Sequence, residues 1–148
     1  MTGVAIRVDA RQLVGTGGDL AERLEKAGRL GGVLDEIGSL VTATTIERFE
    51  RGEAPDGTPW QPSQRAIAEG GLTLVNRGHL KSSTHYVVGG SSVAIGSNLV
   101  YAAIQHGGGQ AGRNLSVTLP ARPIYGISSA DRRGIQDILS DHLREAMQ

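Results

Sequence analysis

The chain has 148 residues, a length that suits one domain spanning 1–148 and a core that forms without cross-links. It has no cysteine, which excludes disulfides, thiolate catalysis and cysteine-based metal sites. No apolar leader and no run of about 18 apolar residues is present, so we expect a soluble protein without a signal peptide or membrane span.

The formal net charge is zero, but the charges are unevenly distributed. Residues 65–122 contain five basic side chains and one acidic side chain, whereas residues 1–56 contain seven basic and ten acidic. An ordinary solvated surface is the simpler interpretation, and the alternative is a face that meets an acidic partner or DNA. A pI of 6.9 argues against a dedicated nucleic-acid binder.

The N-terminal half is predicted to be a strand followed by helices. Alternating residues indicate a strand at Val4–Val8. After the glycine-rich stretch 15–18, Asp19 is placed to begin a helix, and Gly28, Gly31 and Gly32 favour a break before a second helix over Val33–Arg51. That second helix carries an apolar stripe, and Gly52 is placed to end it. The stripe consists of Leu30, Leu34, Ile37, Val41, Thr45 and Phe49.

The middle of the chain is expected to contain a hairpin. The proline-rich turn Pro55–Pro62 holds the single tryptophan, Trp60. Residues 63–82 have no clear periodicity apart from a helical turn near Gly78–Ser82. Two β-rich runs, Thr84–Val88 and Ser92–Gly96, flank Gly89-Gly90 and predict a hairpin with a Gly-Gly turn.

Three further elements complete the chain. A short helix is predicted over Leu99–Gln105 and a strand over Leu115–Leu119. Ser128 is placed to cap a final helix, with Asp131 at the capping-box position. Its apolar stripe consists of Ile135, Ile138, Leu139, His142, Leu143 and Ala146. This order predicts an α+β fold: a small antiparallel or mixed sheet with a central hairpin, packed by N-terminal helices and a C-terminal helix.

No motif predicts catalysis, a metal or a cofactor. The stretch Gly15–Gly18 departs from a dinucleotide fingerprint because Leu20 stands where the third glycine belongs. Ser128 sits in a sequence that superficially suggests a nucleophile elbow, but His142 on the same helix would lie about 20 Å away. The remaining histidines lack metal-ligand spacing and are interpreted as surface or interface residues: His79, His85 and His106.

Six segments together resemble the phage virion morphogenesis family, the tail completion proteins of Mu-like and related contractile-tailed phages. The resemblance covers roughly residues 30–145, and its specificity lies in the order and spacing of the segments. The segments are Ile46–Phe49, Gly52–Trp60, Leu74–Ser83, Val93–Asn98, Tyr101–Gly108 and Leu119–Ser128.

The resemblance implies a non-enzymatic structural subunit that closes a ring, expected to be a hexamer, at the head-proximal end of the tail. Its expected partners are other copies of itself and the tail-tube and neck proteins. Its expected location is the virion tail or neck, with assembly in the host cytoplasm. The alternative is a head–tail connector that contacts DNA. Seven candidate interface residues lie in the matching segments: Phe49, Trp60, Arg77, His79, Tyr101, His106 and Arg122.

Two of these expectations concern particular segments. A lone tryptophan in a stiff loop is either a core side chain or an interface anchor, and the interface role is favoured for Trp60. The glycine- and alanine-rich segments 66–71 and 107–113 are expected to order on assembly, with plain solvent loops as the alternative.

Overall fold

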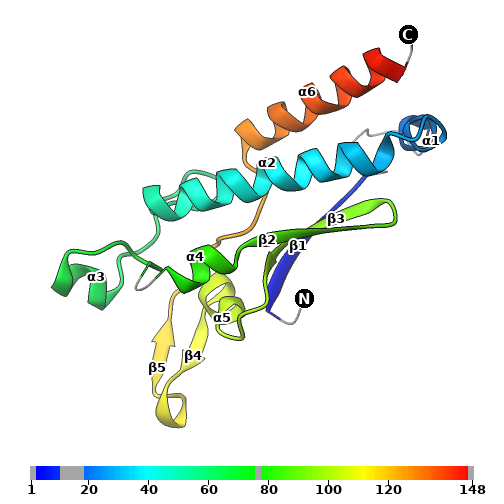
Figure 1. Ribbon diagram of the computed structural model, residues 1–148. Helices are drawn as coiled ribbons and strands as arrows, with labels where there is room; N and C mark the ends of the chain where they lie inside the picture. The colour runs from blue at the N-terminus through cyan, green and yellow to red at the C-terminus, as the bar shows by residue number, and fades with distance from the viewer. Residues whose placement is uncertain (1–2, 11–18, 76–77, 147–148) are drawn as a thin grey trace.

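The computed structural model describes residues 3–10, 19–75 and 78–146, and it confirms the α+β class (Figure 1). A three-stranded antiparallel sheet lies against one long helix, and the C-terminal helix packs on the other side of that helix. In chain order the elements are β1 (Val4–Asp9), α1 (Asp19–Lys26), α2 (Leu30–Arg51), α3 (Gln64–Glu69), α4 (His79–Ser83), β2 (His85–Gly89), β3 (Ser92–Ser97), α5 (Ala102–Gly107), β4 (Gly109–Ala111), a 3₁₀ turn (Arg113–Leu115), β5 (Val117–Leu119) and α6 (Ser129–Ala146).

The sheet has the order β1-β3-β2, so the predicted hairpin supplies its central strand and one edge. Ile95 of β3 lies opposite Ile6 on one side and Tyr86 on the other. The reversal differs by one residue from the predicted Gly-Gly turn. Gly89 pairs with Ser92 at the end of the ladder, which leaves Gly90 and Ser91 as the two turn residues. Gly90 has a φ of 60°, a conformation that glycine adopts without a steric cost.

Helix α2 is buried on two sides because it lies between the sheet and α6. Every residue of its predicted stripe is buried, which confirms that part of the prediction. On the sheet side the ring of Tyr86 packs on Gly38, where a Cβ atom would lie 2.3 Å from the ring. The helix begins at Leu30, three residues earlier than predicted, because the chain breaks at Gly28. Gly52 ends it in the left-handed conformation, as predicted.

Helix α6 runs antiparallel to α2 along its whole length. Contacts between them pair late residues of one helix with early residues of the other, from Arg48 with Asp131 to Arg29 with Glu145. Ile135 and Leu139 of the predicted stripe are buried, whereas Ala146, in the last turn of α6, is exposed.

Between residues 63 and 119, some short elements and element bounds differ from the prediction. Residues 64–69 form α3, where no regular element was expected, because Ser63 accepts a capping hydrogen bond from the Ala66 N–H. The expected helix 99–105 is shifted to 102–107, and an unexpected strand β4 follows it. Strand β5 begins at Val117 instead of 115, because Asn114 and Leu115 have φ angles of 57° and 54° that exclude a strand.

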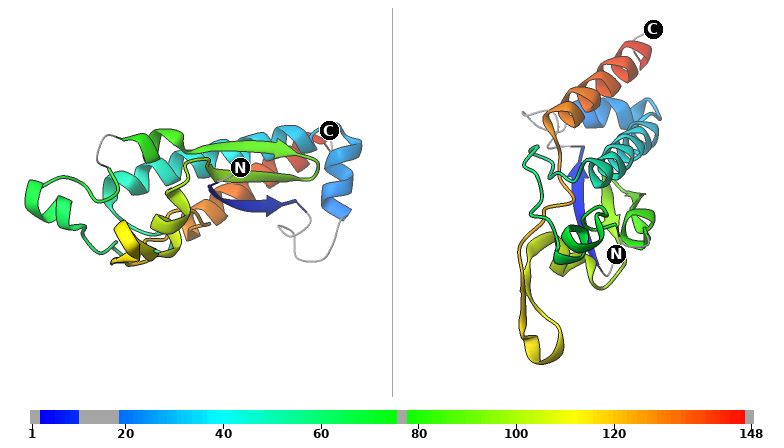
Figure 2. Two further views of the ribbon diagram at one scale, coloured as in Figure 1. Left: turned by 90° about the horizontal axis from the view of Figure 1, so that it is seen from below. Right: turned by 90° about the vertical axis from the view of Figure 1, so that its left-hand side faces the viewer.

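These differences fall on the part of the molecule that extends away from the helix–sheet body. Figure 2 shows α3 at one end of the molecule, with α1 and the C-terminus at the other. The β4–β5 hairpin extends from the sheet on the side away from α2 and α6 (Figures 1 and 2). The expectation that segments 66–71 and 107–113 order on assembly stays a prediction. In the subunit, parts of both form α3 and β4.

Candidate interaction surface

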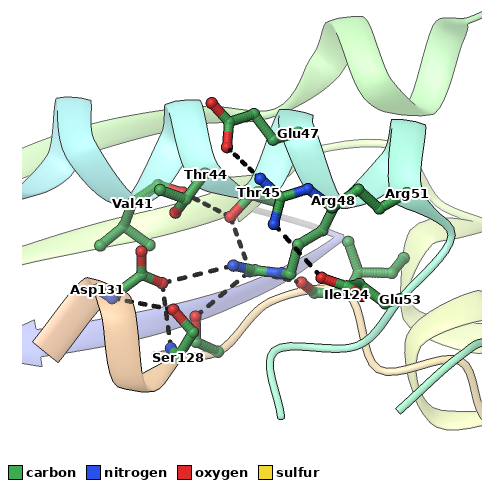
Figure 3. A network of polar contacts seen from close by, with 11 residues as sticks. Val41, Thr44, Thr45, Glu47, Arg48, Arg51, Glu53, Ile124, Ser128 and Asp131 are labelled. Carbon is green, nitrogen blue, oxygen red and sulfur yellow. Dashed lines mark hydrogen bonds and ion pairs between the residues drawn. The ribbon is translucent and has the colours of Figure 1, made fainter. Parts of the chain in front are cut away.

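A buried ion pair connects the long helix α2 to the C-terminal helix α6. The Arg48 Nη1 atom of α2 lies 3.4 Å from Asp131 Oδ2 at the start of α6 (Figure 3). Arg48 Nη2 donates to the carbonyl oxygen of Ile124 at 3.1 Å and to Thr45 Oγ1 at the same distance. Arg48 therefore ties α2 to α6 and to the chain entering α6. Burial lowers the pKa of its guanidinium, although Asp131 opposes that shift.

The same carboxylate completes the predicted helix cap. Ser128 Oγ accepts from the Asp131 N–H at 2.9 Å, and Asp131 Oδ2 accepts from the Ser128 N–H at 3.1 Å. This reciprocal arrangement is a capping box, so Ser128 is a cap, as predicted. The sequence identified Asp131 only as a capping residue and missed its pairing with Arg48. The one available signal was an arginine bordering an apolar stripe, between Thr45 and Phe49.

Trp60 holds the turn after α2 against the body. Its indole Nε1–H donates to the Pro123 carbonyl oxygen at 2.8 Å, and its ring meets Phe49 edge-on with centroids 5.7 Å apart. Both side chains are buried in the core. The expectation that Trp60 is an interface anchor is therefore corrected for the folded subunit. An indole that can reach both apolar neighbours and a carbonyl acceptor is most stable inside.

His106 connects α5 to the segment before α6. Its Nδ1 atom accepts from the Ile124 N–H at 3.1 Å, and its ring stacks on Tyr125 with centroids 6.1 Å apart. Burial lowers the pKa of this imidazole, and an unprotonated Nδ1 is what the two backbone donors require. Burial likewise raises the pKa of the Tyr125 phenol, whose oxygen lies 3.1 Å from Thr84 Oγ1. His106 thus acts here as a neutral structural acceptor.

A groove of about 490 Å³ lies between the α3 segment and the β4–β5 hairpin. One wall is the consecutive run 61–65 with Leu74, the other is the consecutive run 117–120, and His79, Leu80, Tyr101, Gln105 and Arg122 lie between them. Its basic residues are Arg65, His79 and Arg122, and no Asp or Glu among the described residues lines it. Leu74 has a φ of 67°, a conformation that costs a leucine roughly 1–2 kcal/mol. Such strain is concentrated at binding sites in proteins generally.

The groove brings together three of the seven candidate interface residues: His79 and Tyr101, which are exposed, and Arg122, which is buried beneath. Phe49 and Trp60 lie in the core and His106 is half-buried, so the folded subunit does not offer the first two as surface. Arg77 lies outside the described residues. Sequence patterns did not identify Arg65, Gln105 or β5 as parts of a surface site. The two groove walls come from segments about 50 residues apart, and no local pattern joins such segments.

The described residues contain no group of three or more His, Cys, Asp or Glu side chains that could hold a metal ion. Within the same residues, no helix is both long enough and apolar enough to cross a membrane. Fold and surface together define a small α+β protein with a groove between two projecting segments.

The chain belongs to the phage virion morphogenesis family, whose model matches residues 6–144. It is similar to the Mu-like prophage FluMu G protein 2 of Haemophilus influenzae, with 27% identity over 112 residues, covering 76% of this chain and 77% of that protein. No solved structure matches the chain. The resemblance seen in the sequence is thereby confirmed at the level of the family.

Proposed function

We propose that this protein is a non-enzymatic structural subunit that completes the phage tail or joins it to the head, and that it acts as a ring of identical subunits. The observation that carries the proposal is the family match, which extends over nearly the whole chain. The groove between two projecting segments supports it, because an exposed concavity of this kind can accept part of a neighbouring protein. Six subunits are the expected number, and the virion tail or neck is the expected location.

A closed ring requires a heterologous interface, in which one patch of a subunit meets a different patch of its neighbour. Native mass spectrometry over a range of concentrations, followed by electron microscopy of assembled tails with the labelled protein, tests this. We expect one defined subunit number and a label at the head-proximal end of the tail. A protein that stays monomeric in solution and is absent from that end contradicts the proposal.

A second candidate function is contact with DNA in the channel of a connector. The observation that favours it is a set of three cations between residues 65 and 122 that have no carboxylate partner among the described residues: Arg65, Arg113 and Arg122. Binding of duplex DNA whose affinity falls steeply with added salt would support this role. Absence of DNA binding at 50 mM salt would leave the protein–protein role alone.

A further inference from the structure

Strand β5 presents a free edge to the groove. Residues Val117, Thr118, Leu119 and Pro120 all line it, although alternate residues of a strand point to opposite faces. A strand whose consecutive residues all line the same groove faces that groove with its backbone edge. Among the described residues β5 pairs with β4 alone, so the hydrogen-bonding groups of its other edge are available. Such an edge is a template for adding a strand.

The groove also contains a buried cation without an anion. Arg122 is 5% exposed, and the single hydrogen bond of its guanidinium within the described chain runs from Nε to the Gln61 carbonyl oxygen at 2.8 Å. A guanidinium has five N–H donors and its charge is costly to bury without a counterion. Burial lowers the pKa of this group, as expected for an uncompensated cation. Arg65, on the wall formed by residues 61–65, also lacks a carboxylate partner in the described residues.

The Gln105 side chain in the groove has an acceptor atom without a donor. Gln105 lines the groove, and its Oε1 atom is shielded from solvent with no donor within reach in the described part of the chain. A buried acceptor without a donor costs about 1–3 kcal/mol in proteins generally, so such groups are normally satisfied by something. Because Gln105 is half-buried and lines the groove, a rotation of its amide would present Oε1 to a backbone N–H that enters there.

One kind of ligand would satisfy the free edge of β5, the unpaired charge of Arg122 and the Gln105 acceptor. An extended polypeptide supplies backbone groups for the β5 edge and an N–H for Gln105, and an acidic side chain on it supplies the anion for Arg122. We propose that the groove binds an acidic segment of a partner protein in extended conformation, added as a strand to β5. Leu74 and Tyr101 line the groove and would contact apolar side chains that alternate with the acidic ones.

A capped heptapeptide of alternating valine and glutamate is the probe, and the matching valine–lysine peptide is its control. Titration into the full-length protein is followed by NMR at the Thr118 and Leu119 amides and the Arg122 Nε–H. We expect saturable shifts at all three with the acidic peptide and none with the basic one. Arg122→Gln should weaken binding at least tenfold, and Arg65→Gln severalfold.

The variants need a control and a check of folding. Arg132→Gln makes the same chemical change at an exposed position on α6 and should leave binding unchanged. Gln105→Met removes the acceptor without changing any charge, and it should weaken binding even if Arg122→Gln fails to fold. Circular dichroism and urea unfolding establish which variants remain native.

Three results would overturn the proposal. The first is equal binding of both peptides, or of neither. The second is saturation of the same signals by self-association, which would make a second copy the occupant. The third is duplex DNA shifting these signals at lower concentration than the acidic peptide. None of these three results would contradict the proposed role in the tail, because that role is tested on the virion.

Discussion

Arg48 and Asp131, 83 positions apart in the chain, form an ion pair whose two side chains are almost completely shielded from solvent. It joins the C-terminal part of α2 to the first turn of α6, and through Ile124 it also holds the segment that leads from the groove to α6. The position of the groove relative to the helical layer therefore depends on a polar contact inside an otherwise apolar core.

Asp131→Asn should destabilise the protein by roughly 3–5 kcal/mol, because it leaves the Arg48 charge buried and unpaired while keeping an oxygen for the helix cap. Urea unfolding followed by circular dichroism measures the difference. Glu47→Gln is the control, since it breaks the exposed pair with Arg51 and should cost less than about 1 kcal/mol. Equal effects of the two substitutions would show that the buried pair has no special role.

Trp60→Ala should cost about 3–5 kcal/mol, since it removes a large core side chain from Phe49 and leaves the Pro123 carbonyl without its donor. Trp60→Phe should cost less, because it keeps part of the packing and loses the hydrogen bond. Chemical unfolding monitored by circular dichroism is suitable for both. A Trp60→Ala protein that unfolds like the wild type but fails to assemble would restore the interface role.

Stability should fall as the pH is lowered because of His106. Its pKa is depressed in the folded protein, so below the ordinary value of 6.5 the unfolded chain binds the proton more readily. The contribution is fully present above pH 6.5 and is lost between that pH and the folded pKa. His106→Asn keeps an acceptor near Nδ1 and cannot titrate. The difference in unfolding free energy between the two proteins should therefore change over this interval, and a constant difference would contradict the assignment.

Two glycines of α2 should respond oppositely to alanine. Gly38→Ala places a methyl group into the ring of Tyr86, which is also held by its hydroxyl on Asp35, and overpacking of this kind costs about 1–3 kcal/mol. No atom from outside its own stretch of helix lies within 4 Å of the potential Cβ of Gly31 among the described residues, so Gly31→Ala should stabilise the helix by about 0.5–1 kcal/mol. Thermal unfolding of both variants compares them in one helix, and a loss of stability at both sites would indicate another cause.

Elements stabilised by local patterns were predictable from the sequence. The stripe of α2, the glycine that ends it and the Ser128 cap each depend on residues within a few turns of one another. So does the β2–β3 hairpin, whose turn was misplaced by one residue. The family, too, was identified from short segments in a fixed order, because order and spacing are properties of the chain itself.

Features that require contact between distant segments of the chain became visible only in the tertiary structure. Trp60 is a core residue because Phe49 and the Pro123 carbonyl converge on it, and nothing in the proline-rich turn indicates that meeting. The pairing of Arg48 with Asp131 and the groove between residues 61–65 and 117–120 likewise join parts of the chain far apart in sequence. Periodicity reports which face of an element is buried, but it carries no information about which segment covers that face. That choice is made by packing, where burial, buried charge and hydrogen bonding must be satisfied together.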